Sequence, residues 1–347
     1  MNQLNQGFTL FLSLLVEAIP FLLLGVLLSS LLLFFVDERK LAAMMPKNAL
    51  LGALVGSTMG FLFPVCECGN VPVARRLVMQ GVPTPVAIGF LLAAPTINPI
   101  VIWSTWTAFR DQPEIVVLRV VFSLAIATII GYVFSFQKDL TPFLQPALAR
   151  YIRFNPPLQK QTKRQRVDTG PASGNLLQSG TFILGGKTGS SARVNMEAIQ
   201  ASMTSSAKDK PLGEKLRLVV DNIVNELREL GAVLVLGSAI AAAIQVLAPR
   251  DLILSLGAGP ISSVVAMIIL ATIVSICSTV DSFFALSFAS AFTSGSLLAF
   301  LVFGPMVDLK GVGLMLSIFK PRAIFYLFSI AGLLVFLFTL FLNLHVF

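Results

Sequence analysis

Long runs of apolar side chains constrain this chain more than any other feature of its sequence. The hydrocarbon core of a bilayer is about 30 Å thick, so a helix needs about 20 apolar residues to cross it. Eight runs reach or approach this length: Phe8–Val36, Ala49–Val65, Val82–Phe109, Ile115–Phe136, Leu230–Leu247, Ile261–Cys277, Phe283–Phe303 and Ala323–Phe347. These runs predict an all-α, polytopic membrane protein of about eight transmembrane helices.

The composition excludes several other classes of protein. Of the 347 residues, 12% are charged and 56% are hydrophobic, and the mean hydropathy is +0.86. A soluble globular chain carries about 25% charged residues. A soluble enzyme, a disordered chain and a secreted disulfide scaffold are therefore excluded. The first apolar run has no basic segment before it and no small-residue cleavage site after it, so we expect a retained span and not a signal peptide.

A basic, polar segment at residues 137–211 separates the apolar runs into two groups. The formal net charge of the chain is +8. We interpret the basic segment as a mostly disordered cytoplasmic linker that contacts anionic lipid headgroups, and we expect no nucleic acid partner. Gly186-Lys187-Thr188 resembles the end of a phosphate-binding loop, but the earlier glycine is misplaced and no strand–helix unit surrounds it, so no nucleotide is expected. Next, Leu212–Glu229 alternates charged and apolar residues at helical spacing, which predicts an amphipathic helix on the membrane surface.

Paired motifs indicate that the chain is duplicated. Each motif of the first half recurs 210 to 212 residues later. The pairs are Glu17-x7-Gly25 with Glu229-x7-Gly237, Cys66-x3-Asn70 with Cys277-x3-Asp281, Ala94–Asn98 with Gly304–Asp308, and Phe109-Arg110 with Phe319-Lys320. We therefore expect two pseudo-symmetric transmembrane repeats, residues 1–136 and 212–347, of which the second includes the amphipathic helix. The basic pair Arg75–Arg76 favours parallel repeats, and inverted repeats remain open.

All three cysteines of the chain lie in one pair of equivalent motifs. Cys66 and Cys68 are separated by one residue, and Cys277 comes from the other half. Thiolates are ligands for soft ions such as Zn²⁺ and Cu(I), so the three positions predict a site for a soft metal ion or thiophilic metalloid. Two alternatives are that the cysteines are small packing residues, or that Cys66 and Cys68 form a redox pair, although C-x-x-C is the usual spacing for that chemistry.

Several polar side chains are predicted at or near membrane depth, where ionisable groups are costly and are functional candidates by default. Asn70, Asp281 and Asp308 are candidate substrate-binding residues, while Glu67 and Lys310 are candidates for charge balance or proton coupling. A structural alternative for Glu67 is an interfacial position. The alternative for Asp308 is a simple ion pair with Lys310.

Proline residues interrupt one apolar run in each half. Ala94–Pro99 contains two prolines, and Gly304–Asp308 repeats the arrangement. Proline removes a backbone hydrogen-bond donor and so interrupts a helix. An interrupted backbone at membrane depth is tolerated only where it is buried in protein or lines a water-filled cavity. We therefore place a translocation route between these two motifs. Asn98 and Asp308 are expected to face it, with Gly311–Phe319 as half of a broken helix. A packing kink is the alternative.

Two further features indicate a structural and not a chemical role. Gly52, Gly56 and Gly60 form a stripe of small residues that lets helices approach closely. The single histidine, His345, lies near the C-terminal end and is interpreted as an interfacial residue. A histidine-based metal site or a Ser–His catalytic arrangement is therefore excluded.

The motifs PVCECGNVPVARRL, FLLAAPTINPI, ICSTVDSFFA and LAFLVFGPMVDLK resemble the predicted-permease family that includes the organoarsenical efflux permeases (ArsP). This resemblance covers both halves but not the linker. It implies a multi-pass permease of the cell (inner) membrane without its own ATPase. For the arsenical exporters it implies cysteine-based recognition, for which Cys66, Cys68 and Cys277 are the matching positions, although Glu67 stands where a small residue is expected. Some members are paired with a second small membrane protein.

The sequence therefore predicts an integral-membrane permease, a secondary transporter and not an enzyme, for a soft metal ion or thiophilic metalloid compound, with efflux as the implied direction. Its partners would be the lipid bilayer, the small inorganic or organometalloid substrate and a second small membrane protein; no cofactor is expected. Two alternatives stay open. One is a membrane thiol oxidoreductase using Cys66 and Cys68. The other is a non-catalytic membrane subunit with the linker as its docking arm.

Overall fold

The protein is almost entirely helical. The computed structural model describes residues 2–35, 45–46, 48–63, 66–136, 143–146, 148, 212–247, 259–289 and 291–345. Within these ranges the regular elements are helices, and an isolated antiparallel bridge joins Leu144 to Phe319. The predicted all-α class is confirmed. The predicted linker, with its phosphate-loop-like segment, lies outside the described residues except for 143–146 and 148.

The first half of the chain provides a closely packed set of helices. Its elements are α1 (Asn2–Phe35), α3 (Ala49–Met59), η1 (Gly60–Leu62), α4 (Glu67–Met79), α5 (Thr84–Ile97), α6 (Pro99–Ala108) and α7 (Pro113–Ser135). Helices α3, α5 and α7 pack on one another. A Cβ atom at Gly56 would overlap the backbone of Val86, and one at Gly60 would overlap Ala94. The glycine stripe on α3 and η1 therefore lies against α5, as expected for a packing role.

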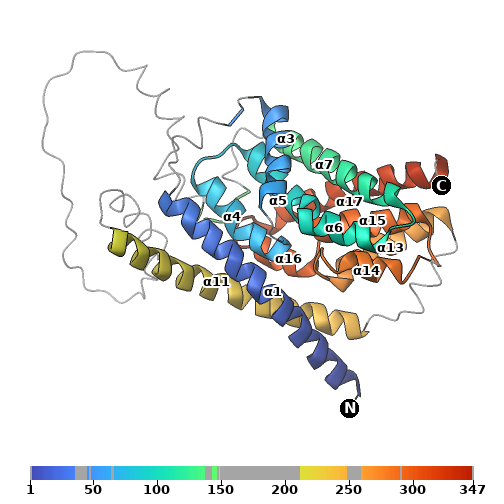
Figure 1. The fold of residues 1–347 in the computed structure, drawn as a ribbon, viewed down its shortest axis with the longest axis horizontal. Coiled ribbons are helices and arrows are strands. Elements are labelled where there is room, and N and C mark those ends of the chain that lie inside the picture. Colours follow the sequence, from blue (N-terminus) through green and yellow to red (C-terminus); the bar gives the residue numbers. More distant parts are fainter. Residues whose placement is uncertain are drawn as a thin grey trace, which may run out of the picture.

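The second half repeats this order of elements. It forms α11 (Leu212–Leu247), α13 (Pro260–Val274), α14 (Asp281–Leu286), α15 (Ser294–Met306), α16 (Leu309–Met315) and α17 (Pro321–His345). For example, α5 begins at Thr84 and α15 begins at Ser294, 210 residues later. Figure 1 shows the two halves, blue to green and yellow to red, packed together in one body.

Helix α11 differs from the expected surface helix followed by a separate span. The structure has one continuous helix of 36 residues. Part of the polar face that suggested a membrane-surface helix is buried against α1 and α4: Asn222 donates a hydrogen bond to Ser30 at 2.8 Å, and Glu226 lies 3.9 Å from Arg76. The polar periodicity of this segment thus reflects polar contacts between helices.

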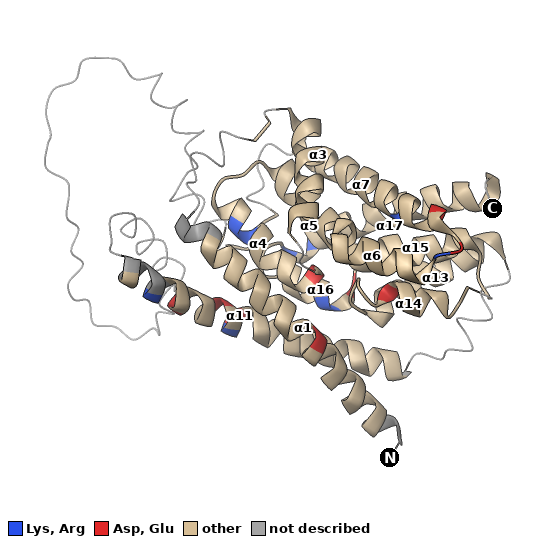
Figure 2. Ribbon diagram, viewed as in Figure 1, with Lys and Arg blue, Asp and Glu red and all other residues tan. Residues whose placement is uncertain are grey.

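Six helical segments in the described part of the chain are long and apolar enough to cross a membrane. They are Asn5–Leu31, Thr84–Ala108, Pro113–Ser135, Val219–Val246, Ser294–Met315 and Pro321–His345. Two shorter apolar helices, Ala49–Leu62 and Pro260–Val274, accompany them. The chain is therefore a multi-pass membrane protein, with six spans by length where the sequence predicted about eight. Helices α5, α13 and α15 carry no charged residue, and Figure 2 shows charges gathered mainly on other helices.

The helices are broken within the two predicted motifs, although Pro95 and Pro305 themselves lie inside α5 and α15. Helix α5 ends at Ile97, Asn98 is extended, and α6 begins at Pro99. In the second half, α15 ends at Met306 and α16 begins at Leu309.

The predicted span Phe283–Phe303 is wrong in its limits. The structure ends α14 at Leu286 and begins α15 at Ser294, so the crossing runs from Ser294 to Met315. The Thr293 hydroxyl accepts a hydrogen bond from the Ser296 backbone amide and thereby caps the new helix. An apolar composition alone does not reveal this interruption.

The two halves contact each other in a reciprocal manner. Helix α6 packs on α14 of the second half, and α16 packs on α4 of the first. Helices at corresponding places in the two halves also pack on each other: α1 on α11, α5 on α15 and α7 on α17. In Figure 1, α1 and α11 run in opposite directions. The basic pair Arg75–Arg76 had favoured parallel repeats, in which these two helices would run in the same direction. In the structure the two arginines are buried and lie against Glu226 and Glu229 of α11.

Candidate functional site

The cysteines of the two halves occupy equivalent positions just before short helices. Cys66 is the extended residue that precedes α4, and its carbonyl accepts a hydrogen bond from the Asn70 amide at 3.0 Å. Cys277 follows the end of α13, and its carbonyl accepts from the Asp281 amide at 3.1 Å. The same local fold therefore presents both thiols, each beside the first turn of a helix.

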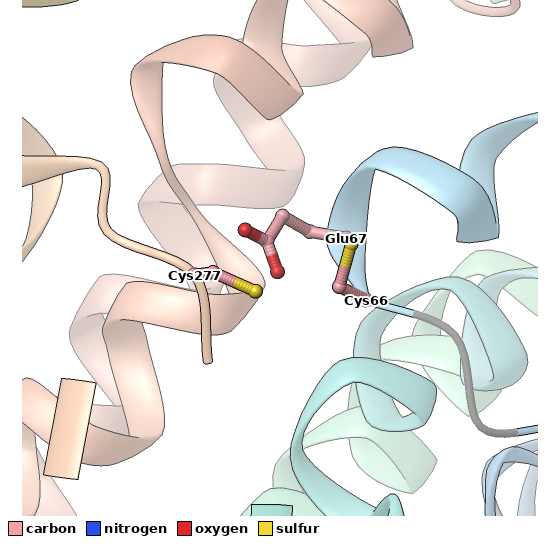
Figure 3. Close-up of side chains that lie close together, drawn as sticks. All are labelled: Cys66, Glu67 and Cys277. Carbon is pink, nitrogen blue, oxygen red and sulfur yellow. The ribbon is translucent and has the colours of Figure 1, made fainter. Parts of the chain in front are cut away.

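These two thiols and one carboxylate converge between the halves. The ligand atoms of Cys66, Glu67 and Cys277 all lie within 4.8 Å of one another, and all three side chains are buried. Figure 3 shows the Glu67 carboxylate extending toward Cys277, which comes from a loop of the second half. The Ser278 hydroxyl donates to Glu67 Oε2 at 3.5 Å, whereas Glu67 Oε1 has no hydrogen-bond partner among the described residues.

Cys68 is the second residue of α4. Its side chain is buried, and its thiol lies next to that of Cys66. The three cysteines are free thiols. The structure thus brings all three predicted thiol positions into one neighbourhood, with Cys66 and Cys277 at its centre.

Lys310 and Glu17 extend the cluster on its charged side. Lys310, at 1% exposure, interacts electrostatically with Cys68, Glu67, Asp308 and Glu17. Glu17, from α1, lies next to the Cys277 thiol, and its Oε1 atom is buried without a hydrogen-bond partner in the described part of the chain. In the sequence, Glu17 was recognisable only as part of a paired motif. A carboxylate inside a long apolar run was the signal that could have identified it.

Asn98 and Asp308 cap the second segment of each broken helix. Asn98 Oδ1 accepts from the Ile100 amide at 3.0 Å, and Asp308 Oδ1 accepts from the Gly311 amide at 2.8 Å. Asp308 Oδ2 is buried and has no hydrogen-bond partner within the described ranges, so it is available to a ligand. Asp308 belongs to the central cluster through Lys310. The structure gives Asn98 a capping contact and no contact with the thiols.

Asn70 holds α4 against α5. Its amide nitrogen donates to the carbonyl of Leu91 at 2.8 Å and to that of Phe90 at 3.3 Å. Its Oδ1 atom is buried and finds no hydrogen-bond partner among the residues that the structure describes. Asn70 therefore has a positioning contact and one free acceptor.

Asp281, a predicted substrate-binding residue, forms an ion pair within the protein. Arg119 of α7 binds both carboxylate oxygens, at 2.6 Å and 3.2 Å. Arg119 also donates to Thr105 at 2.7 Å and to Ser282 at 2.9 Å. Because this buried, bidentate pair satisfies the carboxylate, Asp281 joins the two halves structurally. Arg119 was not among the predicted site residues, although an arginine within an apolar run is a recognisable signal.

The central cluster combines thiol groups with a carboxylate, and further acidic side chains lie in its vicinity. Two thiols and a carboxylate within 4.8 Å offer a set of ligand atoms to a thiophilic ion or metalloid. Each half supplies one of the sulfur atoms at the centre. A ligand held there would be shared by both halves of the chain.

A family model described as "Predicted permease" matches residues 3–344 of the chain. The UPF0718 protein YcgR of Bacillus subtilis (strain 168) is 37% identical over 327 residues, which cover 94% of this chain and 92% of that protein. A "Putative two-component membrane permease complex subunit" of Streptococcus mutans serotype c is 28% identical over 335 residues, which cover 96% of this chain and 94% of that protein. No solved structure matches.

Proposed function

Because the chain belongs to the predicted-permease family and is a multi-pass membrane permease, we propose that its substrate is a soft metal ion or thiophilic metalloid compound. Transport is secondary and crosses the cell membrane outward, as the resemblance to organoarsenical exporters suggests. The observation that carries this proposal is the convergence of Cys66, Glu67 and Cys277 from two halves of the chain. Thiolates bind such species strongly when deprotonated.

The architecture supports a substrate site between two inverted repeats. The order of helices recurs in both halves, α6–α14 and α16–α4 are reciprocal contacts, and α1 and α11 run in opposite directions. Transporters of this construction hold their substrate at the repeat interface, beside interrupted helices. We place the route between the α5–α6 and α15–α16 breaks, with the domain limits 1–136 and 212–347.

A second membrane protein is part of the proposal. The Streptococcus mutans relative is named as a subunit of a two-component permease complex. A similar partner here would use the basic segment 137–211, which we place on the cytoplasmic side, as a docking arm.

The thiol oxidoreductase alternative receives less support. Exchange of thiols with a soluble partner requires access, yet the side chains of Cys66 and Cys68 are 3% and 1% exposed.

Sensitivity of cells to soft ions tests the proposal. Cells lacking the gene are complemented with wild type, Cys66→Ser, Cys68→Ser or Cys277→Ser and exposed to cadmium, silver and trivalent arsenicals. The Cys66 and Cys277 variants should fail to protect, with a smaller defect for Cys68→Ser. Ser263→Ala, which removes a buried hydroxyl that donates to Pro260, is the matched control and should protect fully. Equal membrane abundance of all variants is verified by immunoblot. Full protection by every cysteine variant against every ion would contradict the proposal.

A further inference from the structure

We propose that Ser275 and Ser104 are positioning residues of the soft-ion site. They hold the loop that carries Cys277, residues 275–280 between α13 and α14, against the second segments of the two broken helices, α16 and α6. This inference rests on the proposed function and extends it, because it names residues that fix one of the two central thiols without contacting the cargo.

Ser275 fastens the start of this loop to α16. Its hydroxyl oxygen accepts a hydrogen bond from the backbone amide of Leu309 at 2.9 Å, and the hydroxyl donates to the carbonyl of Thr272 at 3.2 Å. Leu309 is the first residue of α16, so its amide has no partner within that helix. The loop therefore supplies the acceptor that the start of α16 requires.

The backbone at Ser275 makes a serine at this position informative. Its φ is 47°, the one positive value at a non-glycine residue in the described part of the chain. Glycine adopts this left-handed region without steric cost, whereas a side chain such as that of serine is strained there. The side chain of Ser275 is 1% exposed, so contact with water does not explain it. The hydroxyl contact with Leu309 does explain it.

Ser104 fastens the end of the same loop to α6. Its hydroxyl donates to the carbonyl of Thr279 at 2.6 Å. The hydroxyl of Thr279 in turn donates to Cys277 Sγ at 3.6 Å. We call the contacts of Ser275 with Leu309 and of Ser104 with Thr279 the two anchors. One anchor lies two residues before Cys277 and the other lies two residues after it.

The anchors are particular to the loop of Cys277. The residues that stand 211 positions before Ser275 and Thr279 are Pro64 and Cys68, and neither side chain carries a hydroxyl group. The paired motifs therefore preserve the central cysteine in both halves but not the residues that hold its loop. Any effect of the anchors on a bound ion should accordingly act through one of the two central thiols.

Contacts behind the ligands control how well a site binds its ion. Groups that orient ligating side chains typically change metal affinity by about 10- to 100-fold when they are removed. A ligand on a loop needs such support more than a ligand on a helix does. Because the anchors join the loop to α6 and α16, the elements that follow both helix breaks contribute to the placement of Cys277 Sγ.

Cadmium binding to the purified full chain, measured by isothermal titration calorimetry, tests this role. Ser104→Ala and Ser275→Ala should each bind cadmium about 10- to 100-fold more weakly than wild type does. Ser104→Thr keeps the hydroxyl group and should bind as wild type does. Thr107→Val is the matched control and should leave the affinity unchanged, because the Thr107 hydroxyl donates only within α6, to the carbonyl of Trp103 at 2.9 Å.

Ser275→Gly separates the hydroxyl contact from the backbone conformation. Glycine relieves the strain of the positive φ, so this variant should unfold at a higher temperature than Ser275→Ala. Its cadmium affinity should nevertheless be as weak as that of Ser275→Ala, because both variants lack the acceptor for the Leu309 amide. Wild-type affinity in Ser275→Gly would overturn the inference, since the backbone conformation and not the contact would then determine binding.

Double variants show whether the anchors act through Cys277. In the Cys277→Ser background, Ser104→Ala should cause no further loss of cadmium affinity, whereas in the Cys66→Ser background it should cause the same loss as in wild type. A general loss of packing would weaken binding equally in both backgrounds and would contradict the inference. A wild-type chain that binds no cadmium would contradict the proposed function itself. Wild-type affinity in both Ser104→Ala and Ser275→Ala would contradict the positioning role alone.

Discussion

Single residues of this membrane protein use buried charge in two distinct ways. Arg119 and Asp281 form a bidentate pair whose remaining neighbours, Thr105 and Ser282, are hydroxyl groups. Glu67, in contrast, keeps one free oxygen beside two thiols. In the first arrangement Arg119 binds both carboxylate oxygens of Asp281 and joins the two halves. The second is incomplete without a ligand, which is why we assign function to it and structure to the first.

Breaking the Arg119–Asp281 pair should be costly. Arg119→Met leaves the Asp281 carboxylate buried without its counter-ion, so we expect a loss of about 3–5 kcal/mol in the free energy of unfolding. The double variant Arg119→Met/Asp281→Leu should recover most of it, because two apolar side chains replace both charges. Thermal unfolding of the purified chain measures both effects. A double variant as unstable as Arg119→Met would contradict this assignment.

Residue types alone identified only part of the site. The cysteines were recognisable because all three lie in paired motifs, and the structure brings them together. Glu17 and Arg119 were not selected, although each interrupts an apolar run. The partner of a charged residue depends on how helices cross, and nothing in the spacing of Asp281 indicated that α7 would supply its counter-ion.

Individual helices are shaped by prolines at their breaks and by glycines at their contacts. The proline motifs correctly predicted that two apolar runs would be divided, near Asn98 and near Asp308. The interruption between Leu286 and Ser294 was not predicted, because the residues between them include no proline, glycine or charged residue. Length and polarity predict which segments enter the bilayer, but local capping decides where a helix starts.

The contact between α1 and α4 should tolerate no side chain at Gly25. A Cβ atom there would overlap the backbone of Gly69. We expect Gly25→Ala to destabilise the protein by about 1–3 kcal/mol through overpacking. Gly231→Ala is the matched control, since a Cβ atom at Gly231 meets nothing within 4 Å, and it should be neutral or stabilising by up to about 1 kcal/mol. Equal thermal midpoints of the two variants would contradict this packing.

The whole molecule is organised around the interface between its halves. Corresponding helices pack on each other, and α6 and α16 each cross to the opposite half. Cys66 and Cys277 occupy equivalent positions of the paired motifs and meet at this interface. Sequence motifs predicted a duplication, and the basic pair Arg75–Arg76 favoured parallel repeats, whereas α1 and α11 run in opposite directions. Arg75 and Arg76 are paired with glutamates of α11, a contact that their spacing in the sequence did not indicate.

The opposite directions of α1 and α11 predict that their N-terminal ends lie on opposite faces of the membrane. Single cysteines at the exposed positions Asn5 and Gly213, introduced after Cys66, Cys68 and Cys277 are changed to serine, report on this arrangement. A membrane-impermeant maleimide should label one of the two in intact cells and the other only after permeabilisation. Labelling of both from the same face would contradict the inverted arrangement.

The sulfur ligands of a bound soft ion test the central claim most directly. X-ray absorption at the cadmium edge of the purified, cadmium-loaded chain reports the number of sulfur atoms bound to the metal. We predict at least two sulfur ligands in wild type, with one lost in Cys66→Ser and one lost in Cys277→Ser, because each half contributes one thiol to the shared cluster. Cadmium bound only by oxygen and nitrogen, or a sulfur count unchanged in both variants, would contradict a site shared by the two halves.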